Sequence, residues 1–285
     1  MSHFEDNPGV LYIVATPIGN LQDISARALQ VLAWVDRIAA EDTRQSKKLL
    51  HHYGIATPLQ AVHEHNERHV AAALLARLAA GEDIALVSDA GTPLISDPGF
   101  YLVRAARQAG VRVVPVPGPS ALVTALSVAG LPTDRFLFEG FLPAKPAGRR
   151  QRLAEVAGYS CTLVFYESSH RIVDSLADMA AVLGADREAT VARELTKTFE
   201  TVLGGTLSGL LAQLQADSNQ RRGEFVVLVH GAPARAATAI DAASEQVLAV
   251  LMDELPLKQA DSLAAKITGV SKNALYERGV QLKDG

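Results

Sequence analysis

The stretch ALVSDAGTPLISDPG, residues 85–99, begins as a buried β-strand and continues as an unusually polar loop. Its apolar start is followed by two aspartates, two prolines and two glycines, and a helical pattern resumes only near Phe100. Prolines restrict the backbone, and glycines let it approach a ligand closely. Because ligands bind at the carboxyl ends of strands in open parallel sheets, this loop is predicted to hold one.

The N-terminal half alternates short apolar runs with amphipathic helical patterns, which is typical of an α/β fold with a parallel sheet. Strands are predicted at residues 11–16, 37–42, 83–90 and 111–118. Helices are predicted at residues 24–35, 68–81 and 100–110. We therefore expect a first α/β domain over residues 1–118.

The following stretch contains more strand patterns and fewer helices, which predicts a mixed sheet. Strand-like runs lie at residues 135–143, 161–168, 188–194, 200–207 and 223–231, and helical patterns at 119–130 and 170–184. We expect a second α/β domain over residues 119–232. Small residues then predict a linker, and residues 240–285 predict a helical tail.

Composition excludes several classes of protein. The chain of 285 residues has a formal net charge of −4, so any surface for nucleic acid must be local. Cys161 is its single cysteine, which excludes disulfides within the chain and cysteine-cluster metal sites. No apolar run is long enough to cross a membrane, and the N-terminus lacks a signal pattern. We expect a cytoplasmic protein without membrane contact.

Three more loops are predicted at the same edge of the first sheet. They are ATPIGN (15–20), AEDTRQSKK (40–48) and PVPGPSA (115–121). Each is also compatible with ordinary turn chemistry, but four such loops together favour a ligand site. Neither a G-x-G-x-x-G fingerprint nor a P-loop is present, which disfavours dinucleotide binding and nucleotide hydrolysis.

The motifs VATPIGNL, AEDTR, SDAGTPLISDPG, VPGPSA, FYESSHR, ARELTK and GEFVV, in this order, resemble the tetrapyrrole-methylase-like superfamily. More narrowly, they resemble its ribosomal branch, the 16S rRNA (cytidine-2′-O)-methyltransferases that act on cytidine 1402. The resemblance implies a class III methyltransferase fold, with S-adenosylmethionine bound between two α/β domains. It also implies 16S rRNA of the small ribosomal subunit as the substrate, and a homodimer.

The resemblance further implies which residues bind the methyl donor. They are Asp89, Gly91, Thr92, Leu94, Ser120, Ala121, Tyr166, Ala192 and Glu224. Relatives that act on cobalamin precursors usually have G-D-P where this chain has residues 91–93, and a glycine-rich first loop. These departures argue against a tetrapyrrole substrate.

Methylation of a ribose hydroxyl benefits from a base that removes its proton. Glu41, Asp42, Glu167 and Glu194 are candidates at strand ends, and Asp42 and Glu167 are our preferred catalytic residues. Each also has a structural alternative, since Asp42 can pair with Arg44 and Glu167 can cap the following helix. No metal is required, and we expect none.

Two basic segments are candidates for RNA contact. Lys145, Arg149, Arg150 and Arg152 are predicted in a loop without acids, although such a loop can also be merely solvated. In the tail, Ala265, Gly269 and Leu275 have the spacing of a helix-turn-helix. This arrangement would place Lys272 and Arg278 on or near its second helix, and a simple helical cap is the alternative.

Two other functions remain open from the sequence. One is a methyltransferase for a precorrin-type tetrapyrrole. The other is a DNA-binding regulator whose α/β body senses a small ligand. A regulator would bind duplex DNA and would not consume S-adenosylmethionine.

Overall fold

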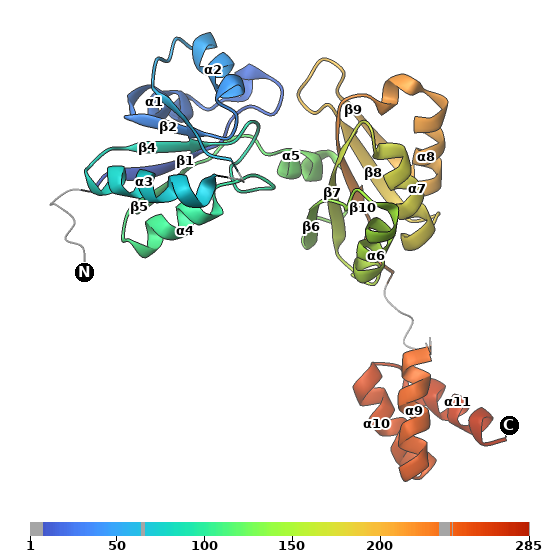
Figure 1. Cartoon of the computed structure of the whole chain (residues 1–285). Coiled ribbons are helices and arrows are strands. Elements are labelled where there is room, and N and C mark those ends of the chain that lie inside the picture. Colours follow the sequence, from blue (N-terminus) through green and yellow to red (C-terminus); the bar gives the residue numbers. More distant parts are fainter. Residues whose placement is uncertain (1–7, 64–65, 234–239, 241, 285) are drawn as a thin grey trace. The chain divides into compact units, whose positions relative to one another are not determined.

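The computed structural model describes residues 8–63, 66–233, 240 and 242–284. The chain divides into two compact units, residues 1–231 and 232–285. The first unit contains two five-stranded sheets with helices, and the second is helical (Figure 1).

The first sheet is entirely parallel, as the alternating pattern predicts. Its strands are β1 (Val10–Val14), β2 (Arg37–Ala40), β3 (Leu59–Ala61), β4 (Ile84–Val87) and β5 (Arg112–Val116), in the order β3-β2-β4-β1-β5. Its helices are α1 (Ala26–Trp34), α2 (Thr43–His52), α3 (Glu67–Ala79) and α4 (Phe100–Gln108), with a short 3-10 helix η1 (Leu21–Asp23). Parallel strands end at one edge, so the loops after β1, β2, β4 and β5 gather there.

Both faces of this sheet are buried, which explains why its central strands are continuously apolar. Alternate residues of β4 enter separate cores, because side chains of a strand point to opposite faces. Ala85 and Val87 pack with residues of α1 and α2, whereas Ile84 and Leu86 pack with residues of α3 and α4.

The second sheet is mixed, as expected. Its strands are β6 (Phe136–Phe141), β7 (Thr162–Ser168), β8 (Glu188–Arg193), β9 (Thr201–Thr206) and β10 (Glu224–Val229), in the order β6-β7-β10-β8-β9. The β6–β7 pair is parallel and the other pairs are antiparallel. Its helices are α5 (Ala121–Val128), α6 (Pro146–Val156), α7 (Ile172–Leu183) and α8 (Leu207–Ala216), with a 3-10 helix η2 (Ser218–Arg221).

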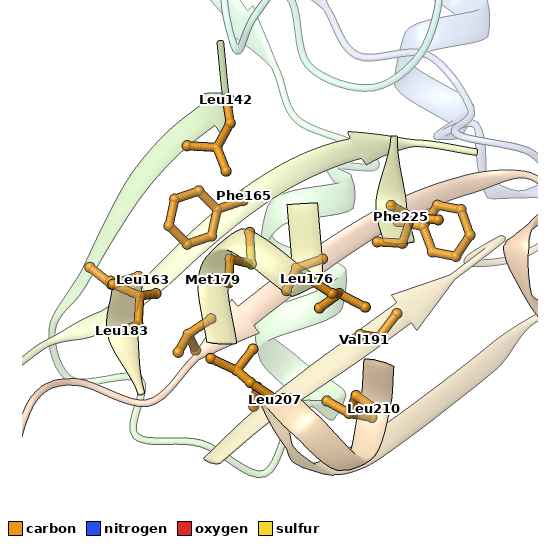
Figure 2. Packing of buried hydrophobic residues seen from close by; sticks show 14 of the residues in the cluster. Leu142, Leu163, Phe165, Leu176, Met179, Leu183, Val191, Leu207, Leu210 and Phe225 are labelled. Atoms are coloured by element: carbon orange, nitrogen blue, oxygen red, sulfur yellow. The ribbon is translucent and has the colours of Figure 1, made fainter. Parts of the chain in front are cut away.

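Strand β7 shows how this sheet is packed. Leu163 and Phe165 enter the core formed with α6, α7 and α8, whose interior includes Met179 and Leu210 (Figure 2). Val164, on the opposite face, packs instead with residues of α5.

The prediction of a basic loop at residues 145–152 is wrong, because most of this stretch forms the start of α6. Pro146 occupies the first turn, where its missing N–H costs nothing. Leu153 and Val156 supply the buried apolar side chains, and they follow the basic run that suggested a loop.

The second unit contains α9 (Ala242–Glu254), α10 (Leu257–Thr268) and α11 (Lys272–Asp284). Gly269 ends α10 in a left-handed conformation with φ +75°, as a turn between two helices requires. Leu275 is fully buried and packs with Ala260 and Ala264. The turn and the buried leucine predicted from the sequence are therefore present. Among the described residues, no helix is long and apolar enough to cross a membrane.

Candidate active site

A pocket of about 550 Å³ lies where strand ends of both sheets in the first unit come together. From the first sheet, Glu41 follows β2 and residues 89–92 and 95–97 follow β4. The second sheet contributes the ends of β7 and β8 and the start of β10. The pocket also includes Ser120 and Ala121 at the start of α5.

The loop after β4 is held in one conformation by its neighbours. Gly91 and Thr16 exchange two backbone hydrogen bonds, of 2.8 and 3.0 Å. The Thr92 hydroxyl donates to the Pro119 carbonyl at 3.1 Å, and the Asp89 carboxylate accepts from the Asp42 amide at 2.9 Å. The four predicted strand-end loops therefore meet, and the β4 loop is preformed rather than free.

Positive φ values show why this loop needs its particular residues. Gly91 has φ +83°, and a Cβ there would lie 3.3 Å from Ile18 Cγ2, against the pocket wall. Leu94 and Ser96 also have positive φ, which is uncommon for residues with a side chain. Such strain is typical of functional sites.

Three carboxylates of the first sheet make this side of the pocket acidic. Burial, followed by the charge of Glu41, raises the pKa of Asp97 to about 7, although a hydrogen bond from Ser88 opposes the shift. Burial, followed by the charge of Asp89, raises the pKa of Glu41. The pocket thus favours either bound protons or a cationic ligand.

Tyr166 forms part of the opposite wall, on β7. Its hydroxyl accepts a hydrogen bond from the Leu122 amide at 3.1 Å, in the first turn of α5. Phe138 and Phe141 contact its ring edge-on, with centroids 4.8 and 5.7 Å away. Burial raises the pKa of Tyr166, so the phenol is neutral at physiological pH.

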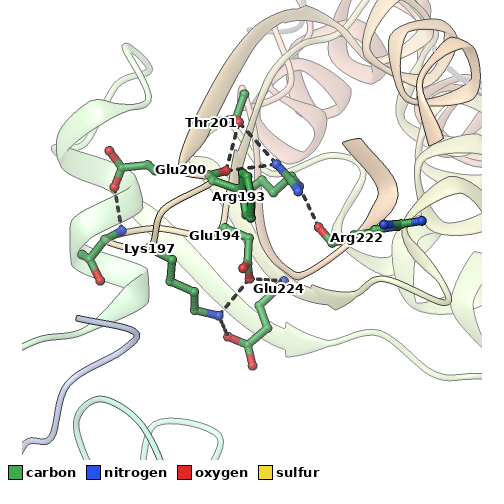
Figure 3. Close-up of polar contacts among 9 residues, drawn as sticks. Arg193, Glu194, Lys197, Glu200, Thr201, Arg222 and Glu224 are labelled. Atoms are coloured by element: carbon green, nitrogen blue, oxygen red, sulfur yellow. Dashed lines mark hydrogen bonds and ion pairs between the residues drawn. The ribbon is translucent and has the colours of Figure 1, made fainter. Parts of the chain in front are cut away.

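Lys197 is the one basic side chain among the described residues that line the pocket. Its ammonium lies 2.8 Å from Glu194 Oε1 and 2.7 Å from Glu224 Oε2 (Figure 3). Burial alone would lower the pKa of Lys197, but these two carboxylates outweigh it and raise the pKa. An ideal Cβ on Gly19 would lie 2.4 Å from Lys197 Cγ, so a side chain in the first loop would displace the Lys197 side chain from this position.

The two predicted catalytic carboxylates have structural roles. Asp42 caps α2 and forms a bidentate pair with Arg44, which lowers the pKa of Asp42 to about 2, and it does not line the pocket. Glu167 touches the pocket but is 2 % exposed. Its carboxylate accepts hydrogen bonds from Ser175 and the Ser168 amide. Asp42 thus has its structural alternative, whereas Glu167 is held by Ser175 and Ser168 and does not cap α7, which has no side-chain cap. Asp97 and Glu41 are the pocket-lining acids whose pKa is raised.

Eight of the nine predicted donor-binding residues line the pocket, namely Asp89, Gly91, Thr92, Ser120, Ala121, Tyr166, Ala192 and Glu224. Leu94 does not line it and packs instead against the α3–α4 core. Sequence reasoning missed Asp97 and Lys197 as pocket residues. Asp97 lies in the motif SDAGTPLISDPG and Lys197 in ARELTK, both of which carried the family resemblance. Their place in these motifs was the signal that could have identified them.

Three of the four predicted RNA-binding residues between 145 and 152 are paired with carboxylates. Arg149 is 3 % exposed and lies 2.6 Å from Asp178, which also pairs with Arg150 at 3.2 Å. Arg152 pairs with Glu139 and with Glu155, each at 2.6 Å. A buried, paired guanidinium cannot contact RNA, so the assignment of Arg149 is wrong.

Lys145 precedes α6 and is exposed. In the tail, Lys272 begins α11 and is half exposed, 3.9 Å from the buried Asp261. Arg278 pairs with Glu245 at 2.5 Å. These three residues remain accessible, at least in part, on their own units.

No group of three or more His, Cys, Asp or Glu side chains in the described part of the chain is arranged to hold a metal ion.

Family models match both units. The model described as "Tetrapyrrole (Corrin/Porphyrin) Methylases" matches residues 10–211, and the model described as "RsmI C-terminal HTH domain" matches residues 238–283.

Curated relatives match nearly the whole chain. "Ribosomal RNA small subunit methyltransferase I" of Pseudomonas aeruginosa is 59% identical over 96% of this chain and 97% of its own. The protein of the same name from Escherichia coli O157:H7 is 56% identical over 97% and 96%.

Solved structures share the fold at low identity. Diphthine synthase has a TM-score of 0.60 and 15% identity, over 78% of this chain and 90% of its own. Cobalt precorrin-4 methyltransferase has a TM-score of 0.56 and 18% identity, over 78% and 94%. A Thermus thermophilus uroporphyrin-III C-methyltransferase, solved with S-adenosyl homocysteine, has a TM-score of 0.53 and 19% identity, over 77% and 97%.

The pocket at the strand ends, the two sheets and the helical tail thus agree with the matches along the sequence: the chain belongs to the tetrapyrrole methylase family, in the group of the ribosomal RNA small subunit methyltransferase I proteins.

Proposed function

We propose that this protein transfers a methyl group from S-adenosylmethionine to the ribose 2′-hydroxyl of cytidine 1402 in 16S rRNA of the small ribosomal subunit. The acidic pocket is the observation that carries the donor assignment. The relatives match the tail as well as the unit that contains the pocket, and their names support rRNA as the methyl acceptor.

The pocket fits such a donor in size and in charge. Ligand pockets typically measure about 300–1,000 Å³, and this one is about 550 Å³. S-adenosylmethionine supplies an electrophilic methyl group on a positively charged sulfonium. Asp89, Glu41 and Asp97 place carboxylates along the wall, where they favour a cation.

The donor-binding role belongs to the eight pocket-lining residues named above. Gly91 brings the backbone to the pocket surface without a side chain, and the tethered β4 loop needs no ordering when the ligand binds. Tyr166, held by the Leu122 amide, fixes the start of α5 against β7.

Asp97 and Glu41 are the proposed proton acceptors for the 2′-hydroxyl, in place of Asp42 and Glu167. A general base is most effective when its pKa lies near the working pH, and the pKa of Asp97 is raised to about 7. Lys197 on the opposite side of the pocket pairs with both Glu194 and Glu224, and its role there would be to hold these two carboxylates in place.

Further proposals concern partners and location. Lys272 and Arg278 of the tail, Lys145 before α6 and the exposed Arg150 within α6 are proposed to contact rRNA phosphates, as predicted from the sequence. The family resemblance supports a homodimer that works in the cytoplasm. No contact with a membrane is proposed.

Three acceptors distinguish the candidate functions. The protein is incubated with methyl-labelled donor and, separately, with small ribosomal subunits, free 16S rRNA and a precorrin. We expect label in ribosomal material, recovered after digestion as 2′-O-methylcytidine. Label in the precorrin alone would assign the protein to tetrapyrrole chemistry. Absence of label in all three, with specific binding to duplex DNA, would assign it to regulation.

A further inference from the structure

Two exposed aromatic rings stand at the start of α4, directly after the pocket loop. Phe100 is 54 % exposed and Tyr101 is 40 % exposed, with ring centroids 5.5 Å apart and nearly perpendicular planes. The Arg68 guanidinium carbon lies 4.5 Å from the Tyr101 centroid, and that of Arg104 lies 5.9 Å from the Phe100 centroid. The four side chains form a surface that we call the aromatic platform.

The aromatic platform is held in place by a buried acid. Gly99 precedes α4 and has no side chain to cap it. Glu67 of α3, 4 % exposed, accepts hydrogen bonds from the Tyr101 amide at 2.7 Å and from the Leu102 amide at 3.3 Å. The next residue, Arg68, donates to the Tyr101 hydroxyl at 2.6 Å. The rings are therefore presented to solvent in a fixed orientation, which lowers the entropy cost of binding.

The two arginines of the aromatic platform are not engaged in ion pairs with described residues. Within the described part of the chain, neither Arg68 nor Arg104 forms an ion pair with a carboxylate. The arginines of α6 differ, since Arg149, Arg150 and Arg152 all pair with acids. The platform thus offers cations that form no ion pair among the described residues, whereas the arginines of α6 share their charge with carboxylates.

The aromatic platform also lies close to the proposed reaction site. Asp97 lines the pocket, and Phe100 follows it by three residues. A residue spans at most about 3.6 Å, so the two Cα atoms are within about 11 Å of each other. A nucleotide chain that presents a ribose to the pocket therefore passes within reach of the rings.

We propose that the aromatic platform binds single-stranded rRNA next to the target nucleotide, with bases stacked on Phe100 and Tyr101 and phosphates contacted by Arg68 and Arg104. Aromatic faces and guanidinium planes are the groups on which unpaired RNA bases stack. This inference rests on the proposed rRNA substrate and assigns the surface that holds it. A second copy of this chain is the competing occupant, and the unpaired cations favour RNA.

The test compares ring removal with a matched surface change. Phe100→Leu with Tyr101→Leu keeps apolar bulk but removes both rings, and Arg68→Gln with Arg104→Gln removes both charges. Tyr159→Leu is the control, because Tyr159 is 51 % exposed and precedes β7 at the end remote from the pocket residues. Affinity is measured for a single-stranded oligoribonucleotide that covers the target cytidine, together with methylation of small subunits, donor affinity and oligomeric state.

We expect each platform double variant to bind the oligoribonucleotide about tenfold or more weakly, with unchanged donor affinity and melting temperature. The charge variant should also show a flatter salt dependence, whereas the control should match the wild type. Unchanged RNA affinity in both variants would overturn the inference, and a changed oligomeric state with unchanged RNA affinity would assign the platform to a second copy. Wild-type protein that fails to methylate small subunits would instead overturn the proposed function.

Discussion

Gly91 lies where the β4 loop, the β1 loop and the start of α5 come closest. A side chain there meets Ile18 and approaches the Pro119 carbonyl, while φ +83° already disfavours an L-residue. The cost of such a conformation is about 1–3 kcal/mol for a residue with a side chain. A β-branched residue adds a steric barrier at the pocket surface.

Gly91→Val is therefore expected to weaken donor binding by at least about tenfold, measured by calorimetry. Gly54→Val is the matched control, because Gly54 has φ +67° but no atom within 4 Å of a Cβ position. Both variants carry backbone strain, and only Gly91→Val changes the pocket. Equal donor affinity in the two variants would remove the β4 loop from the binding site.

Asp97 makes stability depend on pH in a direction opposite to that of most carboxylates. Its raised folded-state pKa, about 7, means that the folded protein retains a proton that the unfolded chain, with an ordinary pKa near 4, has released. Between these values the unfolded state binds fewer protons, so stability falls as pH rises. Above about pH 7 the folded state has the full cost of a charged Asp97.

Asp97→Asn removes that cost and is expected to unfold at higher denaturant concentration than the wild type at pH 8, with the advantage shrinking toward pH 5. Urea denaturation at several pH values measures this difference. Asp134→Asn serves as the control, because Asp134 is exposed and does not line the pocket. A pH-independent difference between wild type and Asp97→Asn would contradict the assignment of the raised pKa.

At the scale of elements, helix α6 shows where sequence patterns mislead. Basic residues without neighbouring acids in sequence indicate a cationic surface, but the fold brings Asp178 and Glu139 to them from α7 and β6. Arg149 becomes part of the interior. Removing one partner of a buried ion pair typically costs about 3–5 kcal/mol, whereas exposed pairs are worth about 0–1 kcal/mol.

Arg149→Ala is thus expected to lower the free energy of unfolding by about 3 kcal/mol or more, and Arg150→Ala by less than about 1 kcal/mol. Urea denaturation of the two variants measures this. The two arginines are adjacent and share Asp178, which makes Arg150→Ala a close control. Similar small losses for both would show that Arg149 is not committed to the interior.

The same elements show how far sequence reasoning extends. Strongly apolar strands such as β4, and helices ended by glycine such as α3, are predicted because their patterns arise from local periodicity. The strand β3 has three residues, too few for a periodic pattern, and α2 has only Leu49 and Leu50 as apolar residues, so neither element is predicted from apolar spacing. The meeting of the strand-end loops at the pocket can be predicted from the parallel topology. The burial of Asp97 and the pairing of Lys197 with two carboxylates cannot, because they depend on contacts between distant segments.

At the scale of the whole molecule, the two units have separate interiors. Every described residue that lines the pocket belongs to residues 1–231, and the tail has its own buried residues, including Leu248, Ala260 and Leu275. The proposed donor site therefore requires only the first unit. The proposed RNA contacts are distributed, since Lys272 and Arg278 lie in the second.

A protein truncated after residue 231 is accordingly expected to fold and to bind the donor with unchanged affinity. It should bind rRNA more weakly, and its affinity should depend less on salt, because phosphate contacts are lost. Calorimetry measures the donor, and filter binding at several salt concentrations measures small subunits. The full chain with Lys272→Gln and Arg278→Gln is the control that separates loss of these charges from loss of the whole tail. If the shortened protein bound the donor poorly, residues of the tail would have to complete the pocket. If it bound small subunits as tightly as the full chain, the tail would serve a purpose other than holding RNA.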